Sequence, residues 1–115
     1  MLRRNEDLTR DVLTELMDGK GDVNRTHFLE LEEFNGKGRL FAQHVLAPGH
    51  SIGYHEHDGE QEAYVILQGR ASYSDNGEMV EIGAGDFTLC PSGEGHSIEN
   101  IGEEDLVFFG LIMNV

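Results

Sequence analysis

Three histidines and one glutamate are spaced so that they could share one metal ion. His55 and His57 lie two residues apart in a segment of strand-like composition, so their side chains point to the same face. Glu62 opens the next strand-like segment, and His96 opens another one much later in the chain. Three imidazole nitrogens and a carboxylate oxygen suit a divalent first-row transition metal, and such a set can leave coordination positions open for water or substrate. A His-x-His pair by itself is more often a solvated strand face, so the surrounding pattern has to decide.

Two longer motifs contain these four residues. In GHSIGYHEHDGEQEAYVILQG, a glycine and five residues precede His-x-His, and four residues, a glutamate, six residues and a glycine follow. In GDFTLCPSGEGHSIEN, a glycine and five residues precede Pro-x-Gly, and two residues, a histidine, three residues and an asparagine follow. By these residue types and spacings, the chain resembles the cupin superfamily over about residues 39–113. The matching positions are Gly49, His55, His57, Glu62, Gly69, Gly85, Pro91, Gly93, His96 and Asn100.

The resemblance implies a small single-domain jelly-roll barrel with one metal ion in its mouth. The ligands that it implies are His55, His57, Glu62 and His96. The ion would be manganese, iron, nickel, cobalt, copper or zinc, because this ligand set alone does not choose among them. Asn100 is expected to form structural hydrogen bonds rather than to bind the metal.

The resemblance also implies a range of functions. Within the superfamily, such metal sites serve decarboxylases and oxidases of small acids, dioxygenases, and sugar isomerases or epimerases, and small bacterial members are linked to oxalate or similar oxyacids. The decarboxylases grip oxalate with an arginine three residues before the first histidine, and Ile52 stands at that position here. The only basic residues from residue 39 onward are Arg39 and Arg70, so a dicarboxylate would depend on the metal for most of its charge neutralisation.

Two functions from different classes follow. The first is a metal-dependent enzyme that binds and transforms a small oxygen-rich molecule, such as an oxalate-like carboxylate, an enol or a diketone. The second is a non-catalytic module that binds or senses a small ligand through its metal. A purely structural barrel ranks third, because four ligand-type side chains that converge without partners are costly to retain.

Two further side chains are candidates for the pocket. Tyr64 shares the strand face of Glu62, from which it could donate a hydrogen bond to a metal-bound molecule. The segment 39–47 carries Gln43 and His44 on opposite faces, and the alternation alone does not tell which one faces the interior. We take Tyr64 and Gln43 as candidate catalytic residues, with ordinary core and surface roles as the alternatives.

The chain from residue 39 to residue 115 is predicted to be all-β. Its strand-like segments are short and are separated by glycine, proline or asparagine, which is typical of a sandwich or barrel. Asn76-Gly77 between two of them is a strong hairpin signal, because a type I′ turn needs positive φ at both positions. The predicted strands are RLFAQHVLA, SIGYHEH, EAYVILQG, ASYSD, EMVEI, DFTLC, HSIEN and DLVFFGLIMN.

Residues 1–38 are expected to form an arm that packs on this barrel. Apolar residues of the segment 6–17 fall on one helical stripe, which predicts a short helix, with an extended arm as the alternative. The segment 23–31, VNRTHFLEL, is predicted to cover or pair with the edge of a sheet.

Composition narrows the partners. With 22 acidic against 8 basic side chains, the net charge of −14 disfavours nucleic acids and anionic membrane surfaces. The single cysteine, Cys90, forms no internal disulfide, and no secretory segment is evident after Met1, so the cytoplasm is the expected compartment. The last strand, LVFFGLIM, is apolar on both faces, which favours a homodimer that covers one of them.

Overall fold

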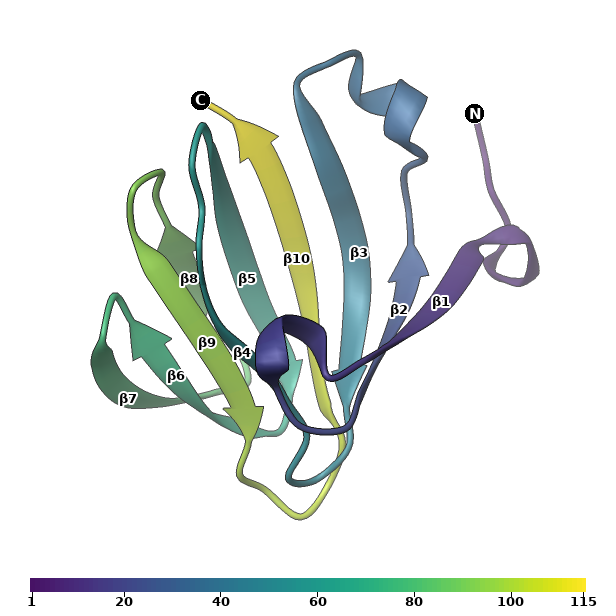
Figure 1. Ribbon diagram of the computed structural model, residues 1–115. Helices are drawn as coiled ribbons and strands as arrows, with labels where there is room; N and C mark the ends of the chain where they lie inside the picture. The colour runs from purple at the N-terminus through teal and green to yellow at the C-terminus, as the bar shows by residue number, and fades with distance from the viewer.

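Two antiparallel sheets face each other in the computed structural model, which describes residues 1–115 (Figure 1). The six-stranded sheet has the order β1-β2-β3-β10-β5-β8, and the four-stranded sheet has the order β4-β9-β6-β7. The strands are β1 (Thr9–Thr14), β2 (Asp22–His27), β3 (Gly38–Leu46), β4 (Ser51–Glu56), β5 (Glu60–Gln68), β6 (Arg70–Asp75), β7 (Glu78–Gly83), β8 (Phe87–Cys90), β9 (Gly95–Asn100) and β10 (Leu106–Asn114). Three 3₁₀ turns complete the fold: η1 (Asn5–Asp7), η2 (Leu16–Asp18) and η3 (Leu31–Phe34). No helix has the length and hydrophobicity needed to cross a membrane.

The strands predicted from residue 39 onward are confirmed as β3 to β10. The turn between β6 and β7 has the expected geometry, with φ of 51° at Asn76 and 98° at Gly77. Asn100 also has the structural role expected of it, because its side-chain nitrogen donates hydrogen bonds to the carbonyl oxygens of Leu46 and Glu104. These bonds tie the end of β9 to the loops at one end of the sandwich.

The helix predicted over residues 6–17 is wrong, and the extended alternative is correct. Residues 9–14 form β1, which pairs along its whole length with β2 at the edge of the larger sheet. This pairing gives hydrogen-bond partners to backbone N–H and C=O groups of β2, which would have none if residues 6–17 were helical. Cross-strand ion pairs such as Asp11 with Arg25 stabilise the pairing further. The segment 23–31 pairs with the sheet edge as predicted, since β2 lies against β3. The division of the chain after residue 38 stays a prediction.

The core fills the space between the two sheets. Its largest fully buried members include Tyr64, Phe108 and Ile98, which come from both sheets. The η2 turn packs against β4, where the approach is so close that a Cβ at Gly53 would collide with the carbonyl oxygen of Met17. The N-terminal segment is thereby held against the strand that carries His55.

Candidate metal centre

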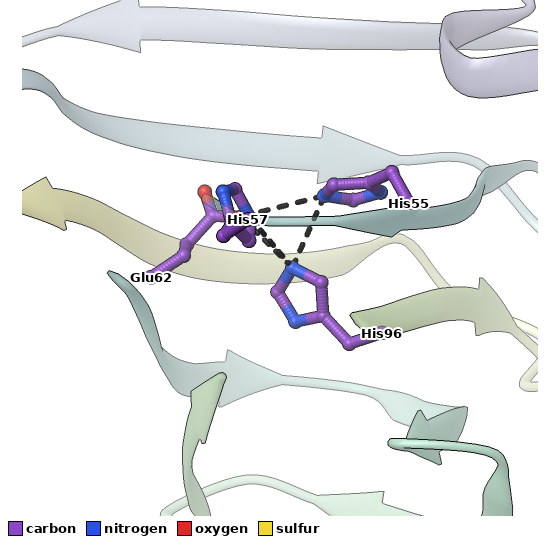
Figure 2. A group of neighbouring side chains, drawn as sticks. All are labelled: His55, His57, Glu62 and His96. Atoms are coloured by element: carbon purple, nitrogen blue, oxygen red, sulfur yellow. Dashed lines mark hydrogen bonds and ion pairs between the residues drawn. The ribbon is translucent and has the colours of Figure 1, made fainter. Parts of the chain in front are cut away.

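The four side chains singled out in the sequence point toward one another between the two sheets (Figure 2). One donor atom from each lies within 4.8 Å of the others, and all but the half-buried His55 are buried. We call them the His–Glu cluster: His55 on β4, His57 directly after β4, Glu62 on β5 and His96 on β9.

The spacing of the donor atoms in the cluster suits a metal ion. His96 Nε2 lies 3.1 Å from His55 Nε2 and 3.2 Å from His57 Nε2. It also lies 3.0 Å from Glu62 Oε1. Metal–ligand bonds of about 2.0–2.2 Å that meet at right angles place neighbouring donor atoms about 3 Å apart. The cluster is therefore able to hold one metal ion.

Hydrogen bonds on the far side of each imidazole orient the rings. His55 Nδ1 lies 2.8 Å from the carbonyl oxygen of Gly53, so it carries the proton and donates it. His57 Nδ1 lies 3.0 Å from Glu60 Oε1, and His96 Nδ1 lies 2.8 Å from the Tyr73 hydroxyl. With Nδ1 of His55 and of His57 bonded in this way, their Nε2 atoms point into the cluster, where each offers a lone pair to a cation once any Nε2 proton has left. Converging lone pairs beside a carboxylate are the arrangement that a cation stabilises.

The charges in the cluster favour cation binding too. Burial would raise the pKa of Glu62, but hydrogen bonds from the three histidines outweigh it and hold that pKa well below the usual value. The hydrogen bond to Glu62 raises the pKa of His57, whereas burial lowers the pKa of His96. The carboxylate is therefore ionised and the His96 ring is neutral at neutral pH.

A cavity of about 120 Å³ adjoins the cluster and is bounded by His55, His57 and Glu62. A cavity of this volume has room for a small ligand beside the cluster. Other side chains that line it include Arg25, Arg39, His44, Ile52, Glu60 and Tyr64.

Of the two candidate catalytic residues, the structure brings one to the cavity. Tyr64 lines it and stacks on the His96 ring, with ring centroids 5.0 Å apart and an angle of 17°. Burial raises the pKa of Tyr64 well above its ordinary value, so the hydroxyl keeps its proton. Gln43 lies on the other face of β3, where it pairs with Phe109 of β10, and it does not line the cavity. His44 is the residue of β3 that faces inward.

Sequence reasoning missed the residues that support the cluster and shape the cavity. Tyr73 and Glu60 hold two of the histidine rings, and neither belongs to the motif positions. Arg25 reaches the cavity from β2, outside the region of family resemblance. A signal for Glu60 was present, because it falls between His57 and Glu62 in the connection that must bring these two side chains together.

The chain belongs to the cupin family, because the family model described as a cupin domain matches residues 42–113. It is 44% identical over 113 residues to the oxalate-binding protein of Thermotoga maritima, and the aligned residues cover 98% of this chain and 93% of that protein. The crystal structure of a predicted oxalate decarboxylase from the same organism is similar over 100% of both chains, with a TM-score of 0.94 and 43% identity. An RmlC-like cupin from Shewanella frigidimarina shares the fold, with a TM-score of 0.77 and 12% identity over 99% of this chain and 90% of that one.

Tyr73→Phe is expected to weaken metal binding about tenfold while the fold is retained. The substitution removes the hydroxyl that holds His96 Nδ1 and leaves the ring volume unchanged, and loss of such supporting hydrogen bonds commonly costs about 10- to 100-fold in metal affinity. Competition with a chelator of known affinity measures the change. Tyr54→Phe is the matched control, because Tyr54 is 49% exposed and takes no part in the cluster. Equal affinities of the two variants would contradict the role given to Tyr73.

Metal affinity is expected to rise with pH through the neutral range. A metal ion binds the neutral imidazole, and the hydrogen bonds to Glu62 and Glu60 raise the pKa of His57 above 6.5. Below that raised pKa, one proton must leave for each ion bound, so the affinity falls about tenfold for each pH unit. Above it the affinity levels off. Glu60→Gln removes one of the carboxylates that raise this pKa, and should move the midpoint of the profile to lower pH; an unmoved midpoint argues against His57 as the competing group.

Proposed function

We propose that this protein binds a small dicarboxylate of the oxalate type at a divalent metal ion held by the His–Glu cluster. The observation that carries the proposal is the convergence of four donor atoms beside a cavity of about 120 Å³. The oxalate-binding relative from Thermotoga maritima, which matches nearly the whole chain, supports the choice of ligand. When bound, the metal supplies positive charge and Lewis acidity for carboxylate oxygens.

Calorimetry on metal-free and manganese-loaded protein tests this proposal. We expect one manganese ion per chain, and oxalate binding only after the metal is present. Elemental analysis of protein purified without a histidine tag then identifies the native ion among manganese, iron, nickel, cobalt, copper and zinc. The proposal would be wrong if the protein bound none of these ions, or if it bound oxalate equally well with and without metal.

Conversion of the bound acid is the second candidate function. The observation that favours it is Tyr64, whose buried, protonated hydroxyl lies in the same cavity. Decarboxylation breaks the carbon–carbon bond of oxalate, releases carbon dioxide and places one proton on the remaining carbon to give formate, and Tyr64 is placed to relay that proton. Incubation of manganese-loaded protein with oxalate, followed by a formate assay, decides between binding alone and turnover. Release of formate by the wild type and not by Tyr64→Phe is the outcome expected of an enzyme.

We further propose that two copies of the chain associate through the outer face of the six-stranded sheet. On this face Phe28, Phe41 and Phe109 form an aromatic cluster, with ring centroids 5.1–6.5 Å apart. Val65 is 39% exposed and Phe87 is 63% exposed. The outward residues of β10, β5 and the edge strand β8 include no charged side chain, so two acidic copies can meet there without burying like charges.

Val65→Lys is expected to convert the dimer to a monomer in analytical ultracentrifugation. The lysine would place a charge within the apolar face that the second copy covers, where it has no partner. Met79→Lys is the matched control, because Met79 is 60% exposed on β7 of the other sheet. A wild-type chain that sediments as a monomer at micromolar concentration would contradict the association.

We propose the cytoplasm as the compartment, on the basis of Cys90. This lone thiol is buried, and burial raises its pKa to about 11, so it stays protonated and unreactive. A chain that depends on no disulfide suits a reducing environment.

A further inference from the structure

Arg25 and His44 are neighbours on the inner face of the six-stranded sheet. They lie directly opposite each other in the register of β2 and β3, and the same row continues to Asp11 on β1 and Phe108 on β10. Both side chains line the cavity beside the His–Glu cluster, yet neither belongs to the cluster. The wall of the cavity that they form therefore comes from two adjacent strands, β2 and β3, of the larger sheet.

Arg25 is held in place with donors to spare. Its Nε and Nη2 atoms donate to the two carboxylate oxygens of Asp11 at 2.9 and 2.8 Å. A guanidinium has five N–H donors, so this fork leaves three of them, including both on Nη1, without a protein acceptor. The Arg25 side chain is 19% exposed, against 53% for Arg39, the other arginine at the cavity. Arg25 is thus the less solvated of the two cations.

His44 has a buried nitrogen that no protein atom satisfies. The residue is 2% exposed, its ring stacks on Phe108 at 4.9 Å, and its Nδ1 has no hydrogen-bond partner. A Cβ at Gly110 would lie 2.7 Å from His44 Cε1 and 3.5 Å from Glu62 Oε2, so the glycine keeps open the space between this ring and the cluster. Burial lowers the pKa of His44 to about 4, so the ring is neutral and offers one N–H and one lone pair.

The metal and Glu62 do not by themselves balance a dicarboxylate. A divalent ion and the Glu62 carboxylate together leave one positive charge, whereas a dicarboxylate brings two negative ones. Both cavity arginines are already paired with a carboxylate, Arg25 with Asp11 and Arg39 with Glu60, so the further stabilisation has to come from N–H donors that these pairs leave free. Ile52, which also lines the cavity, is apolar and cannot supply the difference. Arg25 is the cavity's least exposed positive charge, and its free donors suit the planar geometry of a carboxylate.

We propose that Arg25 and His44 form a recognition wall in the cavity. This wall hydrogen-bonds those carboxylate oxygens of a small dicarboxylate that are not bound to the metal. The inference rests on the proposed function and adds to it the residues that select a dianion over a monoanion. The metal then binds the ligand, and the wall determines which ligands are bound preferentially.

Calorimetry on manganese-loaded variants tests the wall with two probes, oxalate and glycolate. Glycolate can also offer two oxygens to the metal but carries only one carboxylate. For Arg25→Gln we expect oxalate affinity to fall about 10- to 100-fold, the range of a lost charge-assisted hydrogen bond. Its glycolate affinity should fall by less than its oxalate affinity, because chelated glycolate leaves one carboxylate oxygen for the wall where chelated oxalate leaves two. Its manganese affinity should stay within about twofold of wild type, since the metal ligands are untouched. His44→Phe keeps the stacked ring without its nitrogens, and should weaken oxalate binding about fivefold.

Two further variants keep the test decisive. Arg25→Lys retains the charge beside Asp11, so the edge of the sheet stays paired, but it loses the fork and should give an oxalate affinity between wild type and Arg25→Gln. Arg70→Gln is the matched control, because Arg70 pairs with Glu81 on the surface and should bind oxalate as wild type does. Equal losses for oxalate and glycolate, or no loss in Arg25→Gln, would overturn the wall and leave the proposed function standing. A wild-type protein that binds no manganese, or no oxalate once loaded, would overturn both.

Discussion

His96→Ala is expected to lower the metal affinity by more than about 100-fold, because it removes a proposed direct ligand and not merely a supporting hydrogen bond. His96 is fully buried, and its Nε2 lies within 3.2 Å of a donor atom from each of the three other cluster members. No other side chain of the cavity replaces it. Chelator competition with manganese and zinc measures the loss.

The control for this variant is His50→Gln. His50 accepts a hydrogen bond from the backbone of Asp22 through Nδ1 and lies outside the cluster, so its replacement should leave the metal affinity within about twofold. Glu62→Gln gives a second reading, because it removes the charge of the cluster with almost no change in volume. Tight metal binding by both His96→Ala and Glu62→Gln would place the ion elsewhere in the molecule.

Ile98→Ala is expected to lower the free energy of unfolding by about 2–5 kcal/mol. Ile98 is 1% exposed and lies in the core between the sheets, where β9 pairs with both β4 and β6. Truncation leaves a cavity that the neighbouring strands cannot fill without losing their register. Because a domain of this size is stable by only about 5–15 kcal/mol, the change is a large share of the total.

Ile101→Ala is the matched control, since the same atoms are removed three residues further on. Ile101 is 43% exposed in the connection after β9, so the expected loss stays within about 0.5–1 kcal/mol. Urea denaturation of the metal-free proteins measures both variants. Similar losses for the two would mean that the space between the sheets is not the tightly packed core described above.

The sequence predicted the barrel strands well because their boundaries are marked by local chemistry. Asn76-Gly77 fixes a hairpin through positive φ, which two neighbouring residues determine by themselves. The N-terminal segment carries no such mark. Its apolar residues also fit a helical stripe, and only the presence of β2 as a pairing partner, eight residues further along the chain, makes β1 the better solution.

The cluster was predictable and the rest of the cavity was not. The His–Glu spacings are short enough within each motif to specify which side chains share a face. The segment 39–47 is apolar on both faces, with Leu40 and Leu46 on one and Phe41 and Val45 on the other, so alternation could not decide between Gln43 and His44. Arg25 was out of reach because its place beside His44 depends on a long-range strand register.

β2 and the η2 turn bring Arg25, Leu16 and Met17 to the cavity from outside the part of the chain that the family model matches. The proposed metal ligands and Arg25, one of the two residues of the proposed recognition wall, are thus encoded in separate stretches of the gene. Substitutions in the first 38 codons can retune which acid is accepted while the ion-binding apparatus is inherited unchanged. Two cupins with the same motifs can therefore diverge in ligand preference without a single change among their coordinating side chains.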